Sequence, residues 1–127
     1  MRSAPSSRKV HIVDDDDAVR DSMRALLESL GFEVHEYGSA KDFLARCVAD
    51  SNSCLLLDLH MPAMSGIELL EHMQAQGPKL PTIVITGRSD PVLRERALRR
   101  GALELIDKPV AVEALLEALS RAFASVG

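Results

Sequence analysis

The sequence predicts an α/β domain with one parallel β-sheet covered by helices on both faces. Short apolar runs alternate strictly with helical patterns, and three of the five runs are nearly continuous in Val, Ile and Leu. Such runs are typical of strands buried on both faces. Short connections in a strict strand–helix alternation favour parallel pairing. The expected strands cover residues 10–13, 32–37, 54–57, 82–85 and 102–106. The second of these runs alternates more between apolar and polar side chains, which places it nearer an edge.

Helical patterns follow each strand, and their ends carry typical boundary residues. Gly31 ends the first helix, and Ser39 is in position to cap the second. In the fourth helix Asp90 caps, Pro91 opens the first turn and Gly101 ends it. The other four helices are expected at residues 18–30, 41–48, 66–76 and 112–126.

Size and composition limit the classes of function. The chain has 127 residues, 46% of them apolar and 27% charged, which fits one globular domain. A net charge of −4 and 3% aromatic residues argue against a nucleic-acid surface, which needs basic density and often aromatic platforms. We expect residues 1–8 to form a flexible lead and residues 9–127 to form a single domain.

The cysteines and the apolar runs indicate in which cellular compartment the chain is expected. Cys47 and Cys54 lie outside any CxxC motif or Cys/His cluster, which favours reduced thiols over a disulfide. No run approaches the roughly 18 apolar residues of a membrane span. The Ser-rich start also lacks the apolar run of a secretory signal. The expected location is therefore the cytoplasm.

Polar residues stand at the ends of four expected strands. In an open α/β sheet, ligands bind at the carboxyl ends of the strands, so residues far apart in sequence converge there. Strands also end in polar residues simply because they reach the surface, but agreement among four strand ends favours a functional site. The residues at these ends are Asp14, Asp15, Asp58, Thr86, Asp107 and Lys108.

The charges at this edge predict phosphoryl-transfer chemistry. Two carboxylates about 4 Å apart repel by about 4 kcal/mol at an effective dielectric constant of about 20. Asp14, Asp15 and Asp58 therefore need a cation, or a proton on one of them. Ligands that are all oxygens favour a hard ion such as Mg²⁺. Lys108 adds a positive charge and Thr86 a hydroxyl donor, so a carboxylate could attack a phosphoryl group in line.

An ordered set of motifs resembles a known family. The chain has V-D-D at 13–15, L-L-L-D-L-H-M-P at 55–62, I-T-G at 85–87 and D-K-P at 107–109. With these spacings it resembles the receiver domain of bacterial two-component response regulators over residues 9–124. H-I-V-D-D, M-P-A-M-S-G and V-I-T-G are similar to the FixJ-like subgroup. The resemblance implies a flavodoxin-like (βα)5 doubly wound sheet with strand order 2-1-3-4-5.

The resemblance also implies a signalling role. Asp58 would accept a phosphoryl group from a partner histidine kinase, and slow self-dephosphorylation would follow. Asp14, Asp15 and Asp58 would bind Mg²⁺ together with the backbone carbonyl of His60. Such a domain is a phosphoacceptor switch and not an enzyme that acts on a separate substrate.

The resemblance gives further residues a part in this switch. Thr86 and Lys108 would contact the phosphoryl group, and the bond before Pro109 is usually cis in the family. Leu105 departs from the family pattern, which usually has an aromatic residue there that rotates inward on activation. Leucine cannot reproduce that rotamer change, so any coupling would depend on movement of Thr86.

Two further pairs of residues near the expected site are predicted to have distinct roles. Asp16 and Asp17 are expected to cap the first helix, where carboxylates suit the positive end of the helix dipole. His60 and Arg88 stand where family members influence the lifetime of the phosphoryl bond. We hypothesise that this pair sets the lifetime, and an unchanged dephosphorylation rate after exchanging both residues would refute it.

The output of the switch leaves several alternatives open. The surface formed by the fourth helix, fifth strand and fifth helix is expected to bind an output domain or partner, or a second copy when phosphorylated. The chain is either a single-domain regulator or the receiver part of a transcription factor.

Other hypotheses assign the chain a different function. A small phosphatase would need a cap to enclose its substrate, and the short connections leave no room for one. A flavin-binding electron carrier would need a phosphate-binding loop that is not acidic. A receiver that no longer accepts phosphate is a further alternative.

Overall fold

The computed structural model describes residues 8–48, 52–61, 63–87 and 90–125 of the chain. Its sheet has five parallel strands in the order β2-β1-β3-β4-β5. The strands are β1 (Lys9–Val13), β2 (Glu33–Tyr37), β3 (Ser53–Asp58), β4 (Thr82–Thr86) and β5 (Glu104–Asp107). The predicted fold class and strand order are confirmed, and β2 lies at an edge as its alternating pattern indicated.

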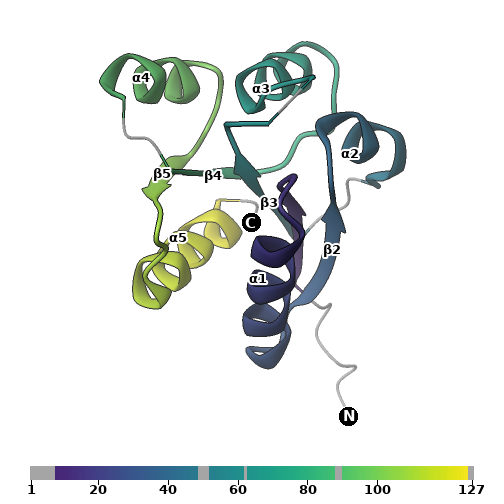
Figure 1. Cartoon of the computed structure of the whole chain (residues 1–127), viewed down its shortest axis with the longest axis vertical. Helices are drawn as coiled ribbons and strands as arrows, with labels where there is room; N and C mark the ends of the chain where they lie inside the picture. Colours follow the sequence, from purple (N-terminus) through teal and green to yellow (C-terminus); the bar gives the residue numbers. More distant parts are fainter. Residues whose placement is uncertain (1–7, 49–51, 62, 88–89, 126–127) are drawn as a thin grey trace.

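Five helices cover the two faces of this sheet. They are α1 (Asp17–Ser29), α2 (Ala40–Arg46), α3 (Gly66–Ala75), α4 (Pro91–Arg99) and α5 (Val112–Ala124). One face is covered by α2, α3 and α4 and the other by α1 and α5 (Figure 1). Among the described residues, none of the helices combines the length and apolar character needed to cross a membrane.

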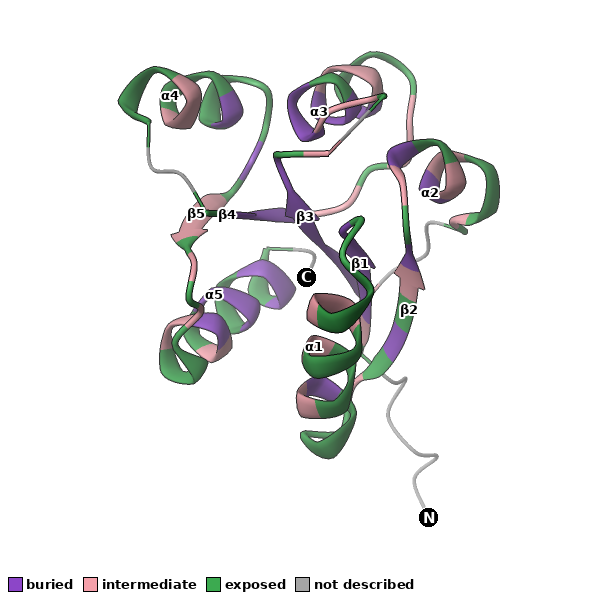
Figure 2. Ribbon diagram, viewed as in Figure 1, coloured by how far each residue is buried: buried purple, intermediate pink, exposed green. Residues whose placement is uncertain are grey.

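The central strands are buried because each lies between two apolar cores. In β3, Leu55 and Leu57 belong to the core under α2, α3 and α4, whereas Cys54 and Leu56 belong to the core under α1 and α5. Successive side chains of a strand point to opposite faces, so both cores need apolar residues from the same strand. Figure 2 shows β3 buried along its length. This accounts for the continuous apolar runs in the sequence.

Side chains cap α1, α2 and α4 at the predicted positions. The Asp16 carboxylate accepts hydrogen bonds from the backbone N–H groups of Ala18 (2.9 Å) and Val19 (3.2 Å), while Asp17 is the first helical residue. Ser39 caps α2 and Asp90 caps α4 in the same way. These bonds satisfy amide groups that have no partner within the helix. The acidic run after β1 thus divides between the helix cap and the sheet edge.

The strands differ from the prediction mainly at their ends. β3 includes Asp58 and β4 includes Thr86, because the parallel pairing continues to these polar residues. β5 begins at Glu104 and not at Ala102, whose N–H donates to the Ala97 carbonyl at the end of α4. The backbones of Asp58 and Thr86 are therefore fixed by the sheet itself.

Neither Cys47 nor Cys54 forms a disulfide. Cys54 is buried in β3, and burial raises the pKa of its thiol to about 12. Cys47 is half-buried after α2. A thiol with such a raised pKa stays protonated and behaves as a small apolar side chain.

The start of α3 lies against the end of β3. The Gly66 N–H donates to the Leu59 carbonyl at 3.1 Å. A Cβ added at Gly66 would stand 2.7 Å from the Asp58 carbonyl oxygen and 2.7 Å from the Leu59 Cα. Ser65 and Glu68 form a reciprocal capping box at this helix start. Only glycine at position 66 lets α3 begin this close to the backbone of Asp58.

We predict that Gly66→Ala lowers the free energy of unfolding by about 1–3 kcal/mol, because the backbone must move to admit the methyl group. Urea denaturation monitored by circular dichroism measures this loss. Gly38→Ala is the control, since its Cβ would lie 3.5 Å from the Arg20 guanidinium, an ordinary contact. Equal stability of the two variants would contradict the close approach.

Candidate functional site

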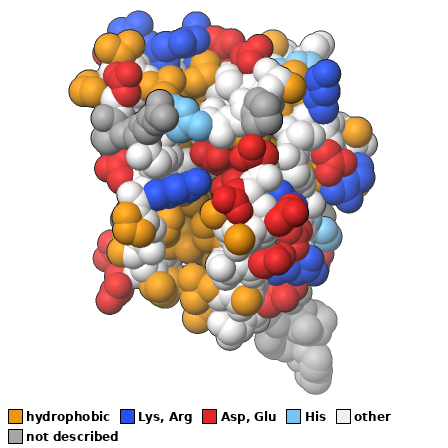
Figure 3. All heavy atoms as spheres, in the orientation of Figure 1, with side chains coloured by type: hydrophobic (Ala, Val, Ile, Leu, Met, Phe, Trp, Pro, Cys, Tyr) orange, Lys and Arg blue, Asp and Glu red, His pale blue; other side chains and the backbone are white. Residues whose placement is uncertain are grey.

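The carboxyl ends of β1, β3 and β5 surround a hollow at one edge of the sheet. Its volume is about 400 Å³. Acidic side chains gather near the middle of this face of the molecule (Figure 3). The described residues that line the hollow are Asp14, Asp15, Asp16, Asp58, His60, Gly87 and Lys108.

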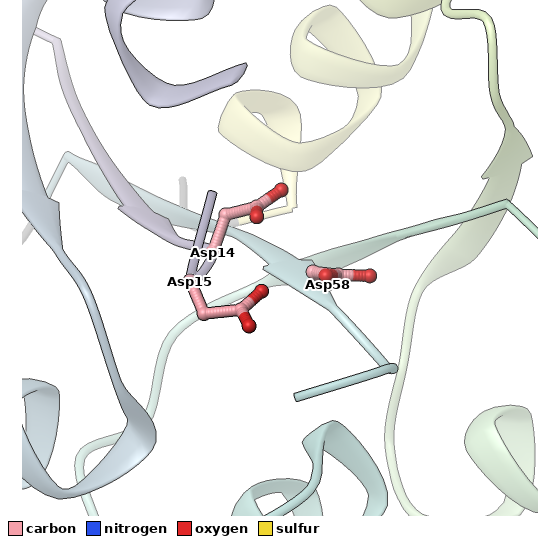
Figure 4. Close-up of side chains that lie close together, drawn as sticks. All are labelled: Asp14, Asp15 and Asp58. Carbon is pink, nitrogen blue, oxygen red and sulfur yellow. The ribbon is translucent and has the colours of Figure 1, made fainter. Parts of the chain in front are cut away.

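Three carboxylates form the centre of the site. Asp14 and Asp15 extend from the end of β1, and Asp58 extends from the end of β3 (Figure 4). One carboxylate oxygen from each lies within 4.8 Å of the others. Asp14 is 5% exposed and Asp58 is 6% exposed, whereas Asp15 is open to solvent. The fold therefore brings together the three aspartates predicted from the strand ends.

The environment of Asp58 disfavours its charged form. Burial is the main cause that raises the pKa of this carboxyl, and the negative charge of Asp14 raises it further. The His60 backbone N–H donates to Asp58 Oδ1 at 3.2 Å, and this bond and the Lys108 charge act in the opposite direction. The balance leaves the pKa above its usual value. A cation among the carboxylates would remove the excess repulsion.

Lys108 supplies the positive charge on the far side of the hollow. Its Nζ lies 3.5 Å from Asp14 Oδ2 and 3.9 Å from Asp58 Oδ1. The Lys108 N–H donates to the Thr86 carbonyl at 2.8 Å, which fixes the backbone just after β5. The Lys108–Pro109 bond is cis, as the family resemblance implies. The lysine thus stands beside the carboxylates without closing the hollow.

Thr86 does not join the other predicted residues. It ends β4 and is only 2% exposed, and it is not among the described residues that line the hollow. Gly87, the next residue, occupies the rim instead. Arg88, paired with His60 in the sequence analysis, lies outside the described residues.

Two features of the site were not foreseen from the sequence. Gly87 lines the rim, where the absence of a side chain leaves room above Lys108. Arg20 on α1 donates to the backbone carbonyl of Asp14. The sequence shows Arg20 three residues after Asp17, a spacing that lets the two side chains meet on a helix. Its bond to Glu36 could not be foreseen in this way, because it depends on where β2 lies in the sheet.

The donor set indicates what the hollow can bind. Carboxylate oxygens from three residues lie close together, and all of these donors are hard oxygen ligands. Few protein ligands with room for water suit a small, hard divalent cation. A buried carboxylate beside a cation site and a lysine is also a suitable nucleophile for a phosphoryl group.

Comparisons with known proteins agree with this geometry. Residues 10–120 match the response regulator receiver domain. The chain is 41% identical over 115 residues to the transcriptional regulatory protein FixJ of Azorhizobium caulinodans, covering 91% of this chain and 54% of that protein. It is 42% identical over 113 residues to FixJ of Rhizobium meliloti, covering 89% and 55%. The chain thus spans about half the length of these curated relatives.

The solved structures show the same likeness in three dimensions. The crystal structure of FixJ-N has a TM-score of 0.88 and 38% sequence identity, and the match covers 97% of this chain and 98% of that one. The motifs, the strand order and the family match all agree. The chain belongs to the response regulator receiver domain family and is similar to its FixJ members.

Proposed function

We propose that the chain is a phosphorylation-controlled switch that accepts one phosphoryl group on Asp58 in a Mg²⁺-dependent reaction. The observation that carries this proposal is the buried Asp58 carboxylate, which lies beside two further carboxylates and a lysine ammonium group. A buried nucleophile whose charge neighbouring groups can balance suits phosphoryl transfer. The domain assists its own modification and does not act on a separate substrate.

The reaction would be an in-line displacement at phosphorus. An Asp58 carboxylate oxygen forms the new O–P bond, while the bond from phosphorus to a nitrogen of the kinase histidine breaks. The His60 N–H orients the carboxylate through Asp58 Oδ1. The Lys108 ammonium, already within 3.9 Å of that oxygen, would neutralise charge on the incoming phosphoryl oxygens. Water later hydrolyses the acyl phosphate slowly.

The cation fits the residues present. Asp14, Asp15 and Asp58 would hold Mg²⁺, and the backbone carbonyl of His60 is the proposed fourth protein ligand. When bound, Mg²⁺ neutralises negative charge on the carboxylates and on the phosphoryl oxygens. The chain itself contributes the close spacing of the carboxylates and the bond from the Asp16 N–H to Asp14 Oδ1 at 2.9 Å, which orients one of them.

The change of state would begin at Thr86. Its hydroxyl would move toward the phosphoryl group and draw the chain before α4 with it. Leu105 is half-buried on β5 and packs against the core under α2, α3 and α4, so it can follow such a shift without an aromatic rotamer change. His60 and Arg88 are proposed to control how long the phosphoryl bond lasts.

The proposed partners are a sensor histidine kinase and an output domain or partner protein in the cytoplasm. The face formed by α4, β5 and α5 is the proposed output surface, and a phosphorylated homodimer would use the same face. Two ion pairs already cross it: Arg94 with Asp107 at 3.4 Å and Arg121 with Glu104 at 2.8 Å. Relatives about twice as long that regulate transcription support an output domain. No direct nucleic-acid contact by this domain is proposed.

Phosphorylation of Asp58 is tested by intact-mass measurement after incubation with acetyl phosphate. We expect the mass of one phosphoryl group to be added in Mg²⁺, and none with chelator or in Asp58→Asn. Asp21→Asn, which removes an exposed carboxylate of α1, is the matched control and should behave like wild type. Absence of any gain in folded wild-type protein, beside a control regulator that is modified, would contradict the proposal.

The raised pKa of Asp58 predicts how stability depends on pH in chelator. The folded state binds this proton more tightly than the unfolded state, so ionisation destabilises the fold as pH rises through the folded pKa. Asp58→Asn should therefore exceed wild type in free energy of unfolding by on the order of 1 kcal/mol at neutral pH, with the difference shrinking toward about pH 4.

Urea titrations across this pH range measure the difference, with Asp21→Asn as the control. Adding Mg²⁺ should stabilise wild type and leave Asp58→Asn nearly unchanged, because the ion loses a ligand. A pH dependence of opposite sign, or the same dependence in Asp21→Asn, would show that the ionisation of Asp58 does not destabilise the fold.

A further inference from the structure

The backbone that carries two of the three carboxylates is the short segment after β1, residues 14–16, here named the acidic loop. Its Asp14 N–H donates to the Tyr37 carbonyl of β2 at 3.2 Å. Its Asp14 carbonyl accepts a hydrogen bond at 2.5 Å from Nη1 of Arg20, one turn into α1. The loop is therefore tied to its surroundings on both sides of the first aspartate.

A single guanidinium group joins three elements at this point. Besides the Asp14 carbonyl, Arg20 donates through Nη2 to the Asp17 carboxylate and through Nε to Glu36 Oε1 at 3.1 Å. The acidic loop, the first turn of α1 and the edge strand β2 thus share one planar group. The fixed fork of guanidinium donors suits such a three-way contact, which an ammonium group cannot reproduce.

Burial and charge show that this contact is built into the fold. The Arg20 side chain is only 15% exposed. Burial opposes its charge, but the hydrogen bonds that Arg20 donates to Glu36 and Asp17, together with the negative charges of these residues, outweigh that effect and leave its pKa raised. Glu36 is itself held by a second arginine, since Arg24 Nη1 lies 2.8 Å from its Oε2. The anchor on β2 is therefore a charged carboxylate with two cationic partners.

The atom that Arg20 contacts determines its effect on the site. It binds the backbone carbonyl of Asp14, whereas Lys108 lies near the Asp14 carboxylate. The guanidinium thus orients the chain that bears the carboxylate while that carboxylate faces the hollow. Groups that orient metal ligands from behind typically change metal affinity by about 10–100-fold.

We infer that Arg20 is a positioning residue for the cation site: it holds the acidic loop so that Asp14 and Asp15 meet Asp58 at the spacing a divalent cation requires. The inference rests on the proposed function, because it takes the three aspartates to be that site. It adds a residue on α1, with its anchor Glu36 on β2, to the groups that determine Mg²⁺ affinity.

The chain offers a matched control in Arg24. This residue lies one turn later on the same helix and pairs with the same Glu36, and with Glu28. Within the described part of the chain its guanidinium contacts no residue of the acidic loop. Arg20→Met and Arg24→Met therefore each remove one cation from Glu36, but only the first releases the Asp14 carbonyl.

The test is calorimetric or fluorescence titration of the metal-free protein with Mg²⁺ alone, together with hydrogen exchange at the Asp16 amide. We expect Arg20→Met to weaken Mg²⁺ binding by about 10-fold or more and to speed exchange at Asp16. Arg24→Met should stay within about twofold of wild type. Arg20→Lys, which keeps the charge but not the fork, should remain weakened and guards against failure of the Met variant to fold.

The outcomes separate this inference from the proposed function. If wild type binds Mg²⁺ and the Arg20 variants match Arg24→Met in affinity and exchange, the positioning role is refuted while the switch stands. If wild type binds no Mg²⁺ at all, the positioning role of Arg20 and the proposed Mg²⁺-dependent function are both refuted. A loss confined to urea stability, with Mg²⁺ affinity unchanged, would identify Arg20 as a structural residue only and overturn the inference.

Discussion

The close approach of the Asp14, Asp15 and Asp58 carboxylates is the constraint on which the rest of the site depends. The parallel sheet brings these carboxylates to within 4.8 Å, and burial of two of them prevents water from screening their charge. Burial and the nearby Asp14 charge both disfavour the charged form of Asp58, and a bound cation would offset them. Lys108 places an opposite charge beside the carboxylates, Arg20 donates to the Asp14 backbone carbonyl, and the His60 N–H donates to Asp58 Oδ1.

The surrounding fold supplies the rigidity that this arrangement requires. Strand pairing continues through Asp58 and Thr86, so the polar residues are held by the sheet ladder. Gly66 lets α3 begin against the backbone of Asp58. Thr86 is buried at the end of β4, and its carbonyl accepts a hydrogen bond from the Lys108 N–H, so the ends of β4 and β5 are joined beside the hollow.

Much of this was predictable because the determining signals are local. Continuous apolar runs identify buried parallel strands, and caps such as Asp16 and Ser39 mark helix starts, so the fold class was predicted correctly from these patterns. The strand order followed from the family resemblance and is also confirmed. The three aspartates expected at the strand ends do lie close together. The parts that were not predicted depend on partners distant in sequence. The burial of Thr86, the contact of Arg20 with Glu36 and the late start of β5 follow from strand register and packing, which no short pattern encodes.

The central claim is that the acidic hollow is a specific cation site. NMR titration of the metal-free protein with Mg²⁺ tests it most directly, by following the backbone amides of Asp16 and His60, which donate to Asp14 and Asp58. The account predicts saturable shifts concentrated at these two amides and their neighbours, and their loss in Asp58→Asn. Shifts that do not saturate, or that spread evenly over the exposed acidic residues, would contradict it.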